Sequence, residues 1–99
     1  MKLIENNLQK IIDLCQKYKV YKLFVFGSAL TDKFNEQSDI DLVVDFKDVN
    51  LADYADNYFD FKEALSKLLG RNIDLLEDKG VRNPVLRKNI DNTKLLIYG

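Results

Sequence analysis

A strand-like segment, a helix-like segment and a second strand-like segment follow one another in the middle of this chain. Residues 39–46 alternate between acidic and apolar side chains, as a half-buried strand does. Residues 49–69 repeat apolar side chains every three to four positions, as a helix does, and Gly70 is a suitable place for that helix to end. Residues 72–76 again have the pattern of a strand. Because two strands joined by a crossover helix lie parallel in one sheet, this order predicts an α/β fold.

The segments on either side of this unit add helices and strands to the same sheet. An amphipathic helix is predicted over residues 4–18, and strands are predicted over residues 21–26 and 93–98. Residues 83–90 begin with an Asn-Pro pair that is typical of a helix start. Hydrophobic residues make up 46% of the chain, enough for a proper core. We therefore expect a single domain over residues 1–99, of the α/β (α+β) class, with a small mixed sheet of about four strands and flanking helices.

The absence of some residue types limits the chemistry of the chain. It contains no histidine, which excludes a histidine general base, a serine–histidine–aspartate triad and a histidine-ligated zinc site. Cys15 is the one cysteine, so the chain forms no internal disulfide and no cysteine-rich metal cluster. Its place on the apolar face of the first predicted helix indicates a core side chain. Carboxylates, hydroxyls, lysines, arginines and backbone amides remain, and they suit hard cations such as Mg²⁺.

The net charge of −1 conceals an uneven distribution along the chain. Residues 1–31 hold five basic and two acidic side chains, residues 32–66 hold three and ten, and residues 67–99 hold seven and four. This pattern shows no broad basic face, so we expect no nucleic-acid partner. The chain begins without the apolar stretch of a signal peptide, and no segment approaches the ~18 apolar residues of a membrane span. With one thiol in addition, we expect a cytoplasmic protein without a membrane partner.

Three aspartates on the predicted strands are candidate metal ligands. Asp39 and Asp41 lie two residues apart on one strand, so their side chains share a face, with Cβ atoms roughly 6–7 Å apart. Like charges at this distance repel unless a cation lies between them, although a solvent-exposed acidic face has the same pattern. If the strand over residues 72–76 is the parallel neighbour, Asp74 lies level with both. Three converging carboxylates are the ligand set expected of a two-metal phosphoryl-transfer site.

The Gly27-Ser28 pair follows the first predicted strand, where the backbone must turn sharply. Glycine allows a ligand to approach closely, and the amides after it, with a serine hydroxyl, can bind a polyphosphate. An ordinary turn between two strands is the alternative interpretation. If the first two strands are antiparallel, Gly27 and Ser28 face Asp39 and Asp41.

Taken together, these motifs resemble a known family signature. The sequence FVFGS over residues 24–28, ten further residues and then DIDLVV over residues 39–44 are similar to the signature of the polymerase-beta-like nucleotidyltransferase superfamily. The short chain and its segments 83–90 and 97–99 resemble the minimal nucleotidyltransferase (MNT) branch of that superfamily. The resemblance spans roughly residues 20–99.

The resemblance implies a transferase that binds ATP or another nucleoside triphosphate through two Mg²⁺ ions. It makes Asp39 and Asp41 metal ligands, and it makes Asp74 a third carboxylate that helps to bind the catalytic metal and takes the proton of the acceptor. Gly27 and Ser28 then hold the β- and γ-phosphates. A hydroxyl of the acceptor attacks the α-phosphate, and pyrophosphate leaves.

The chain departs from the family pattern just after the serine. Members of the MNT branch usually carry an arginine and then a glycine three and four places on, where this chain has Thr31 and Asp32. Loss of a cation and of a flexible glycine weakens the hold on a triphosphate, and Asp32 adds repulsion. Lys33 and Arg82 are the candidate replacements for the missing charge, and Lys33 is the predicted ligand-binding one.

The resemblance also implies a partner protein. A chain of this length has no room for a large second domain that binds an acceptor, so a partner or another copy presents it. In the MNT branch the partner is a small helical toxin with a HEPN domain, which the antitoxin inactivates by adding AMP to a tyrosine. The alternative is a binding module with weak or no catalysis, which neutralises a toxin by stoichiometric binding. Association of two copies stays open.

Overall fold

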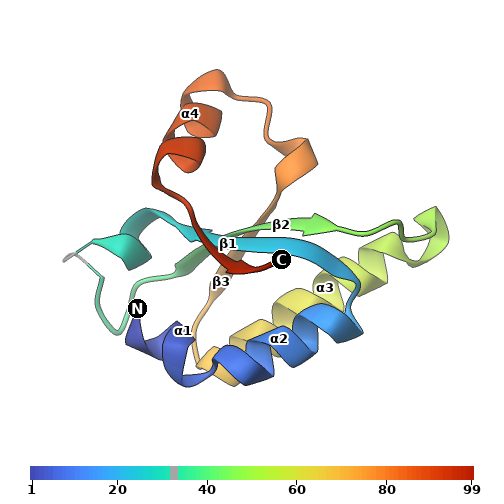
Figure 1. Ribbon diagram of the computed structural model, residues 1–99, viewed down its shortest axis with the longest axis horizontal. Coiled ribbons are helices and arrows are strands. Elements are labelled where there is room, and N and C mark those ends of the chain that lie inside the picture. Colours follow the sequence, from blue (N-terminus) through green and yellow to red (C-terminus); the bar gives the residue numbers. More distant parts are fainter. Residues whose placement is uncertain (32–33) are drawn as a thin grey trace.

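A four-stranded mixed sheet with the strand order β3–β2–β1–β4 forms the centre of the molecule (Figure 1). The computed structural model describes residues 1–31 and 34–99. The predicted α/β class with a small mixed sheet is confirmed. The strands are β1 (Val20–Phe26), β2 (Ile40–Phe46), β3 (Ile73–Glu77) and β4 (Leu95–Tyr98). The helices are α1 (Lys2–Asn6), α2 (Leu8–Lys17), α3 (Leu51–Leu69) and α4 (Pro84–Thr93), with 3₁₀ turns η1 (Gly27–Leu30) and η2 (Asp78–Gly80).

The crossover unit predicted for the middle of the chain is present. β2 and β3 pair in parallel, and Asp41 lies opposite Asp74. α3 connects them and ends at Gly70, whose left-handed φ of 64° is easily adopted by a residue without a side chain. β1 is antiparallel to β2, with Phe26 opposite Asp41, so the end of β1 lies beside the beginning of β2. Three adjacent strands therefore bring Gly27, Asp41 and Asp74 to the same end of the sheet.

The two faces of the sheet are covered to different extents (Figure 1). One face packs against α1, α2 and α3 around the main core, whose most deeply buried side chains include Ile11, Cys15, Leu23, Leu42, Phe61 and Leu65. On the other face, α4 contributes Ile90 to a smaller cluster with Phe26 and Val43. Because side chains alternate along a strand, Asp41 and Asp74 lie on this second face. The acidic side chains are thus on the more open side of the sheet.

α3 is amphipathic, as its spacing predicts. Phe61, Leu65 and Leu69 are buried in the main core, whereas Asp53 and Glu63 are exposed to solvent. No helix in the described part of the chain is long and apolar enough to cross a membrane.

The helices at the two ends of the chain differ from the predicted ones. The predicted helix over residues 4–18 is two helices that meet at Asn7, whose side-chain amide donates to a main-chain oxygen four residues earlier at 2.8 Å. Such a bond competes with the main-chain bonds of a continuous helix. The last helix reaches Thr93 rather than residue 90, and the Thr93 hydroxyl donates to the main-chain oxygen of Asn89 at 2.7 Å. The spacing of apolar residues registers neither difference, because Asn7 and residues 91–93 are polar.

Cys15 is fully buried in the main core, as its position on the first helix predicts. Burial raises the pKa of its thiol to about 12. The thiol therefore stays protonated near neutral pH, and it acts as a packing side chain rather than a nucleophile.

Candidate active site

Gly27 and Asp41 are in direct contact where β1 ends and β2 begins. Gly27 has a φ of +73°, in the left-handed region that side chains disfavour. A Cβ atom at this position would lie 2.5 Å from Oδ2 of Asp41, far inside a normal contact distance. The carboxylate can lie against the backbone here only because residue 27 is a glycine. Antiparallel pairing of the first two strands predicts this juxtaposition.

Asp41 and Asp74 are direct neighbours on the parallel strands β2 and β3. Asp41 is half-buried and Asp74 is exposed, and the two side chains share the face that α4 partly covers. Neighbouring strands lie about 4.8 Å apart, so two carboxylates in register are close enough to share one ligand. Mg²⁺ is commonly held by one or two carboxylates together with substrate phosphates. This donor pair therefore fits the metal that the sequence predicts.

Asp39 lies just before the regular part of β2. It precedes β2, is exposed, and lines a groove with Ser66, Arg71 and Asn72 between the end of α3 and the beginning of β3. Over residues 1–31 and 34–99, no group of three acidic, histidine or cysteine side chains is close enough to hold one metal ion. The alternation of side chains along β2 begins at Ile40, the first residue of the strand. It therefore does not determine where the side chain of Asp39 points. Ligation by all three aspartates remains a prediction.

The other predicted ligand-binding residues and the candidate replacement Arg82 belong to different parts of the chain. Ser28 follows Gly27 in the turn η1, so its main-chain amide belongs to the loop that leaves β1. Lys33 lies outside the described residues. Arg82 is exposed between η2 and α4, and it lines a groove with Leu76 of β3. Arg82 therefore lies beside the later residues of β3.

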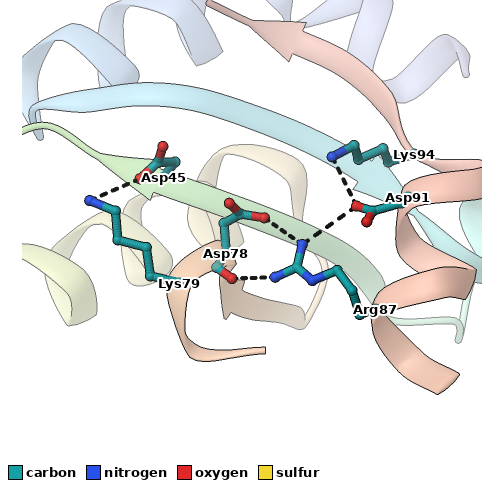
Figure 2. Close-up of polar contacts among 6 residues, drawn as sticks. All are labelled: Asp45, Asp78, Lys79, Arg87, Asp91 and Lys94. Atoms are coloured by element: carbon teal, nitrogen blue, oxygen red, sulfur yellow. Dashed lines mark hydrogen bonds and ion pairs between the residues drawn. The ribbon is translucent and has the colours of Figure 1, made fainter. Parts of the chain in front are cut away.

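A network of charged side chains holds α4 to the turn that follows β3 (Figure 2). Nη1 of Arg87 lies 2.8 Å from Oδ1 of Asp78 and 3.4 Å from Oδ1 of Asp91. Nη2 of Arg87 also donates to the main-chain oxygen of Asp78. The hydrogen bond that Arg87 donates to Asp78 holds the pKa of the guanidinium above its usual value. The network fixes the helix that covers the sheet next to the paired aspartates.

Arg71 was not assigned a role by sequence reasoning, yet it contacts the segment that leads to Asp39. Its Nη1 atom donates to the main-chain oxygens of Asn35 at 2.9 Å and Ser38 at 2.8 Å. These partners are 36 and 33 residues away along the chain, so no local pattern indicates the contact.

Comparison with known proteins identifies the family. The chain matches the family model described as polymerase beta, nucleotidyltransferase, over residues 9–99, a range that contains all of the predicted site residues. It is 38% identical over 85 residues to a protein of Methanocaldococcus jannaschii named "Putative protein adenylyltransferase". That match covers 86% of this chain and 82% of the relative.

Solved structures share the fold. One described as a "putative minimal nucleotidyltransferase" has a TM-score of 0.78 at 26% identity and covers 95% of this chain and 92% of that chain. A toxin–antitoxin structure with AMP-PNP has a TM-score of 0.70 at 25% identity, with coverage of 94% and 73%. A complex of a tri-AMPylated Shewanella oneidensis HEPN toxin with an MNT antitoxin has a TM-score of 0.66 at 21% identity, with coverage of 96% and 71%. The chain therefore belongs to the polymerase beta nucleotidyltransferase family, in its minimal branch, and is a transferase enzyme.

Proposed function

We propose that this chain transfers AMP from ATP to a hydroxyl group of a partner protein, and that the partner is a HEPN-type toxin for which the chain is the antitoxin. The observation that carries the proposal is the contact of Gly27 with Asp41 and the register of Asp41 with Asp74. The name of the Methanocaldococcus relative supports transfer of an adenylyl group to protein. The toxin–antitoxin structure with AMP-PNP supports an adenine nucleotide as the donor and a toxin as the partner.

The donor phosphates belong at the end of β1 in this proposal. The main chain turns at Gly27, which has no side chain, so that a β- or γ-phosphate can approach the amides of the turn that follows. The amides of Gly27 and Ser28, at the start of η1, are the groups that bind these phosphates. Asp41 and Asp74, with Asp39 from the preceding segment, are the residues that hold Mg²⁺, which when bound offsets the negative charge of the triphosphate.

In this proposal the donor phosphates and the proton acceptor lie on opposite sides of Asp41, because the strand order is β3–β2–β1. The phosphates leave on the β1 side of Asp41, and Asp74 lies on the opposite side, on β3. The acceptor oxygen forms a bond to the α-phosphorus while the bond from that phosphorus to the bridging oxygen of the β-phosphate breaks. Pyrophosphate carries away the bonding electron pair, and the proton of the acceptor hydroxyl passes to the Asp74 carboxylate.

Transfer of label from ATP tests the proposal. The protein is incubated with Mg²⁺, ATP labelled at the α-phosphate and the product of the neighbouring open reading frame. Wild type is expected to label that product, and Asp41→Asn is expected to lower the rate by about 100-fold or more. Asp45→Asn, four residues further along the same face of β2, is the matched control and is expected to stay within a few-fold of wild type. Absence of label, or equal rates in both variants, contradicts the proposal.

Neutralisation without turnover is the second candidate, and the departure at Thr31 and Asp32 favours it. Here the chain binds the toxin stoichiometrically, and the aspartates are not needed. A double variant, Asp39→Asn with Asp41→Asn, distinguishes the two in cells that express the toxin. Retained neutralisation supports stoichiometric binding, and loss of neutralisation with normal protein levels supports catalysis.

A further inference from the structure

The segment over residues 34–38 leads directly to Asp39 and has a turn of its own. The main-chain amide of Ser38 donates to the main-chain oxygen of Asn35 at 3.1 Å, and the amide of Asn35 donates to the Ser38 hydroxyl at 3.1 Å. The amide of Gln37 donates to the Asn35 side chain at 2.8 Å. These bonds shape the turn, but they all lie within it, so they do not position it against the sheet.

Arg71 joins this turn to the beginning of β3. Its Nη1 atom donates to the two main-chain oxygens at the ends of the turn, those of Asn35 and Ser38, at 2.9 Å and 2.8 Å. Its guanidinium carbon lies 4.6 Å from the centre of the Phe34 ring, so the cation also covers the aromatic ring. A planar guanidinium makes the two hydrogen bonds and the ring contact at once, which a lysine ammonium does not.

The position of Arg71 is itself fixed. The Ser66 hydroxyl donates to the main-chain oxygen of Arg71 at 2.7 Å, and the Arg71 amide donates to the main-chain oxygen of Ser66 at 3.3 Å. Asn72, the next residue, accepts a hydrogen bond at 3.0 Å from the amide of Ile40, which follows Asp39. The turn before Asp39 is therefore attached on both sides to the connection that leads to Asp74.

We propose that Arg71 is a positioning residue that holds the turn 34–38 and thereby sets the place of Asp39 relative to Asp41 and Asp74. This inference rests on the proposed function, because it assumes that Asp39 contributes to the metal–nucleotide site. Asp39 precedes the regular part of β2, so strand geometry does not fix its side chain. The contacts of Arg71 supply a constraint at this point.

Hydrogen exchange tests the attachment of the turn without any activity. In Arg71→Ala, the amides of residues 34–38 are expected to exchange about tenfold faster, while those of β2 and β3 keep their protection. Lys67→Ala is the matched control, because Lys67 is an exposed cation of the same region that pairs with Glu63 at 3.0 Å. Unchanged exchange in Arg71→Ala overturns the proposal, whether or not the enzyme transfers AMP.

Metal binding tests the link to Asp39. Mn²⁺ is titrated into the protein with AMP-PNP and followed by electron paramagnetic resonance, so neither turnover nor the acceptor is needed. Arg71→Ala and Asp39→Asn are each expected to weaken Mn²⁺ binding by about tenfold, and the double variant is expected to be no weaker than either. Arg71→Lys should recover part of the loss, and Lys67→Ala should bind as wild type does.

The outcomes separate this inference from the proposed function. Additive losses in the double variant, or wild-type Mn²⁺ binding in Arg71→Ala, show that Arg71 does not act through Asp39 and overturn the inference. If wild type does not bind Mn²⁺ with AMP-PNP, the proposed function fails, and the link to Asp39 fails with it. The exchange experiment then still decides whether Arg71 holds the turn.

Discussion

The two ends of the β2–β3 pair both carry acidic side chains, but in different surroundings. Where the strands end, the acidic groups have partners from nearby elements: Asp45 lies 3.6 Å from Nζ of Lys79 (Figure 2), and Glu77 accepts a hydrogen bond from the Tyr54 hydroxyl. The negative charges at this end are thus balanced or hydrogen-bonded by the chain itself.

Where the strands begin, acidic side chains of the two strands lie side by side. Asp41 and Asp74 are placed in register, like charge beside like charge, and Asp41 lies against the backbone of Gly27. Two carboxylates in this position favour a cation between them, because the cation lowers their mutual repulsion. The acidic groups at the end of the strands thus stabilise the fold, and the proposed function assigns the pair at the beginning to a ligand.

The largest effect that tests this comparison is expected at Asp74. Asp74→Asn removes the proposed proton acceptor and is expected to lower the rate of AMP transfer by about 10²–10⁴-fold. Glu77→Gln, on the same strand, is expected to change the rate only a few-fold and to lower the midpoint of urea unfolding. Equal losses of activity in the two variants would show that the two ends of the strands do not differ in function.

The next effect concerns the glycine beside Asp41. Gly27→Ala places a Cβ atom 2.5 Å from Oδ2 of Asp41 in addition to the strain of a positive φ, so the free energy of unfolding should fall by about 2–3 kcal/mol. Gly70→Ala carries the strain alone, because nothing lies within 4 Å of its added Cβ, and about 1 kcal/mol is expected. Urea unfolding of both variants measures the difference. Equal losses would show that the contact with Asp41 does not matter.

A smaller effect is expected at the hydroxyl of Tyr54. Burial, and then the hydrogen bond to Glu77, raise the pKa of Tyr54 above its ordinary value of 10.0. Because the folded-state pKa is the higher one, wild type should lose stability as the pH rises above about 10. Tyr54→Phe should lower the free energy of unfolding by about 1 kcal/mol at neutral pH. The stability of this variant should also fall less steeply than that of wild type as the pH rises above about 10. Thermal unfolding between pH 8 and pH 11 measures both, and an unchanged slope would contradict the assignment.

The smallest effect is expected at Asp91, in the network that holds α4. The hydrogen bond from Lys94 holds the pKa of Asp91 below its ordinary value of 3.8. Because the pKa of Asp91 is lower in the folded state than in the unfolded state, Asp91 adds to the free energy of unfolding above about pH 4. This stabilisation is lost as the pH falls through the folded-state pKa. Asp91→Asn should therefore flatten the acid side of the stability profile and leave AMP transfer unchanged. A profile identical to that of wild type would contradict this.

The sheet and the Asp41–Asp74 pair could be predicted because both follow from short-range patterns. Alternation marks the strands, the spacing of apolar residues marks α3, and a crossover of this length places β2 and β3 parallel. Once the strands are parallel neighbours, equal positions along them place Asp41 level with Asp74. The contact of Gly27 follows in the same way from antiparallel pairing with β1.

The remaining features depend on side chains that meet across long stretches of sequence. Arg71 reaches residues more than 30 positions away, and no periodicity points to that contact. The break at Asn7 depends on one side-chain hydrogen bond, which has no effect on the apolar pattern of the helix. Alternation along β2 begins only at Ile40, so the strand does not determine the direction of Asp39, and its grouping with the other two aspartates stays a prediction.

The most direct test of the account is the map of amide chemical shifts when ATP and Mg²⁺ are added to the isotopically labelled protein. We expect shifts concentrated at Gly27, in the rest of η1, and at Asp41 and Asp74, with little change at Asp45 and Glu77. Shifts centred instead on the end of the strands, around Tyr54 and Lys79, would contradict the assignment of the two ends, as would the absence of any shift at millimolar ATP.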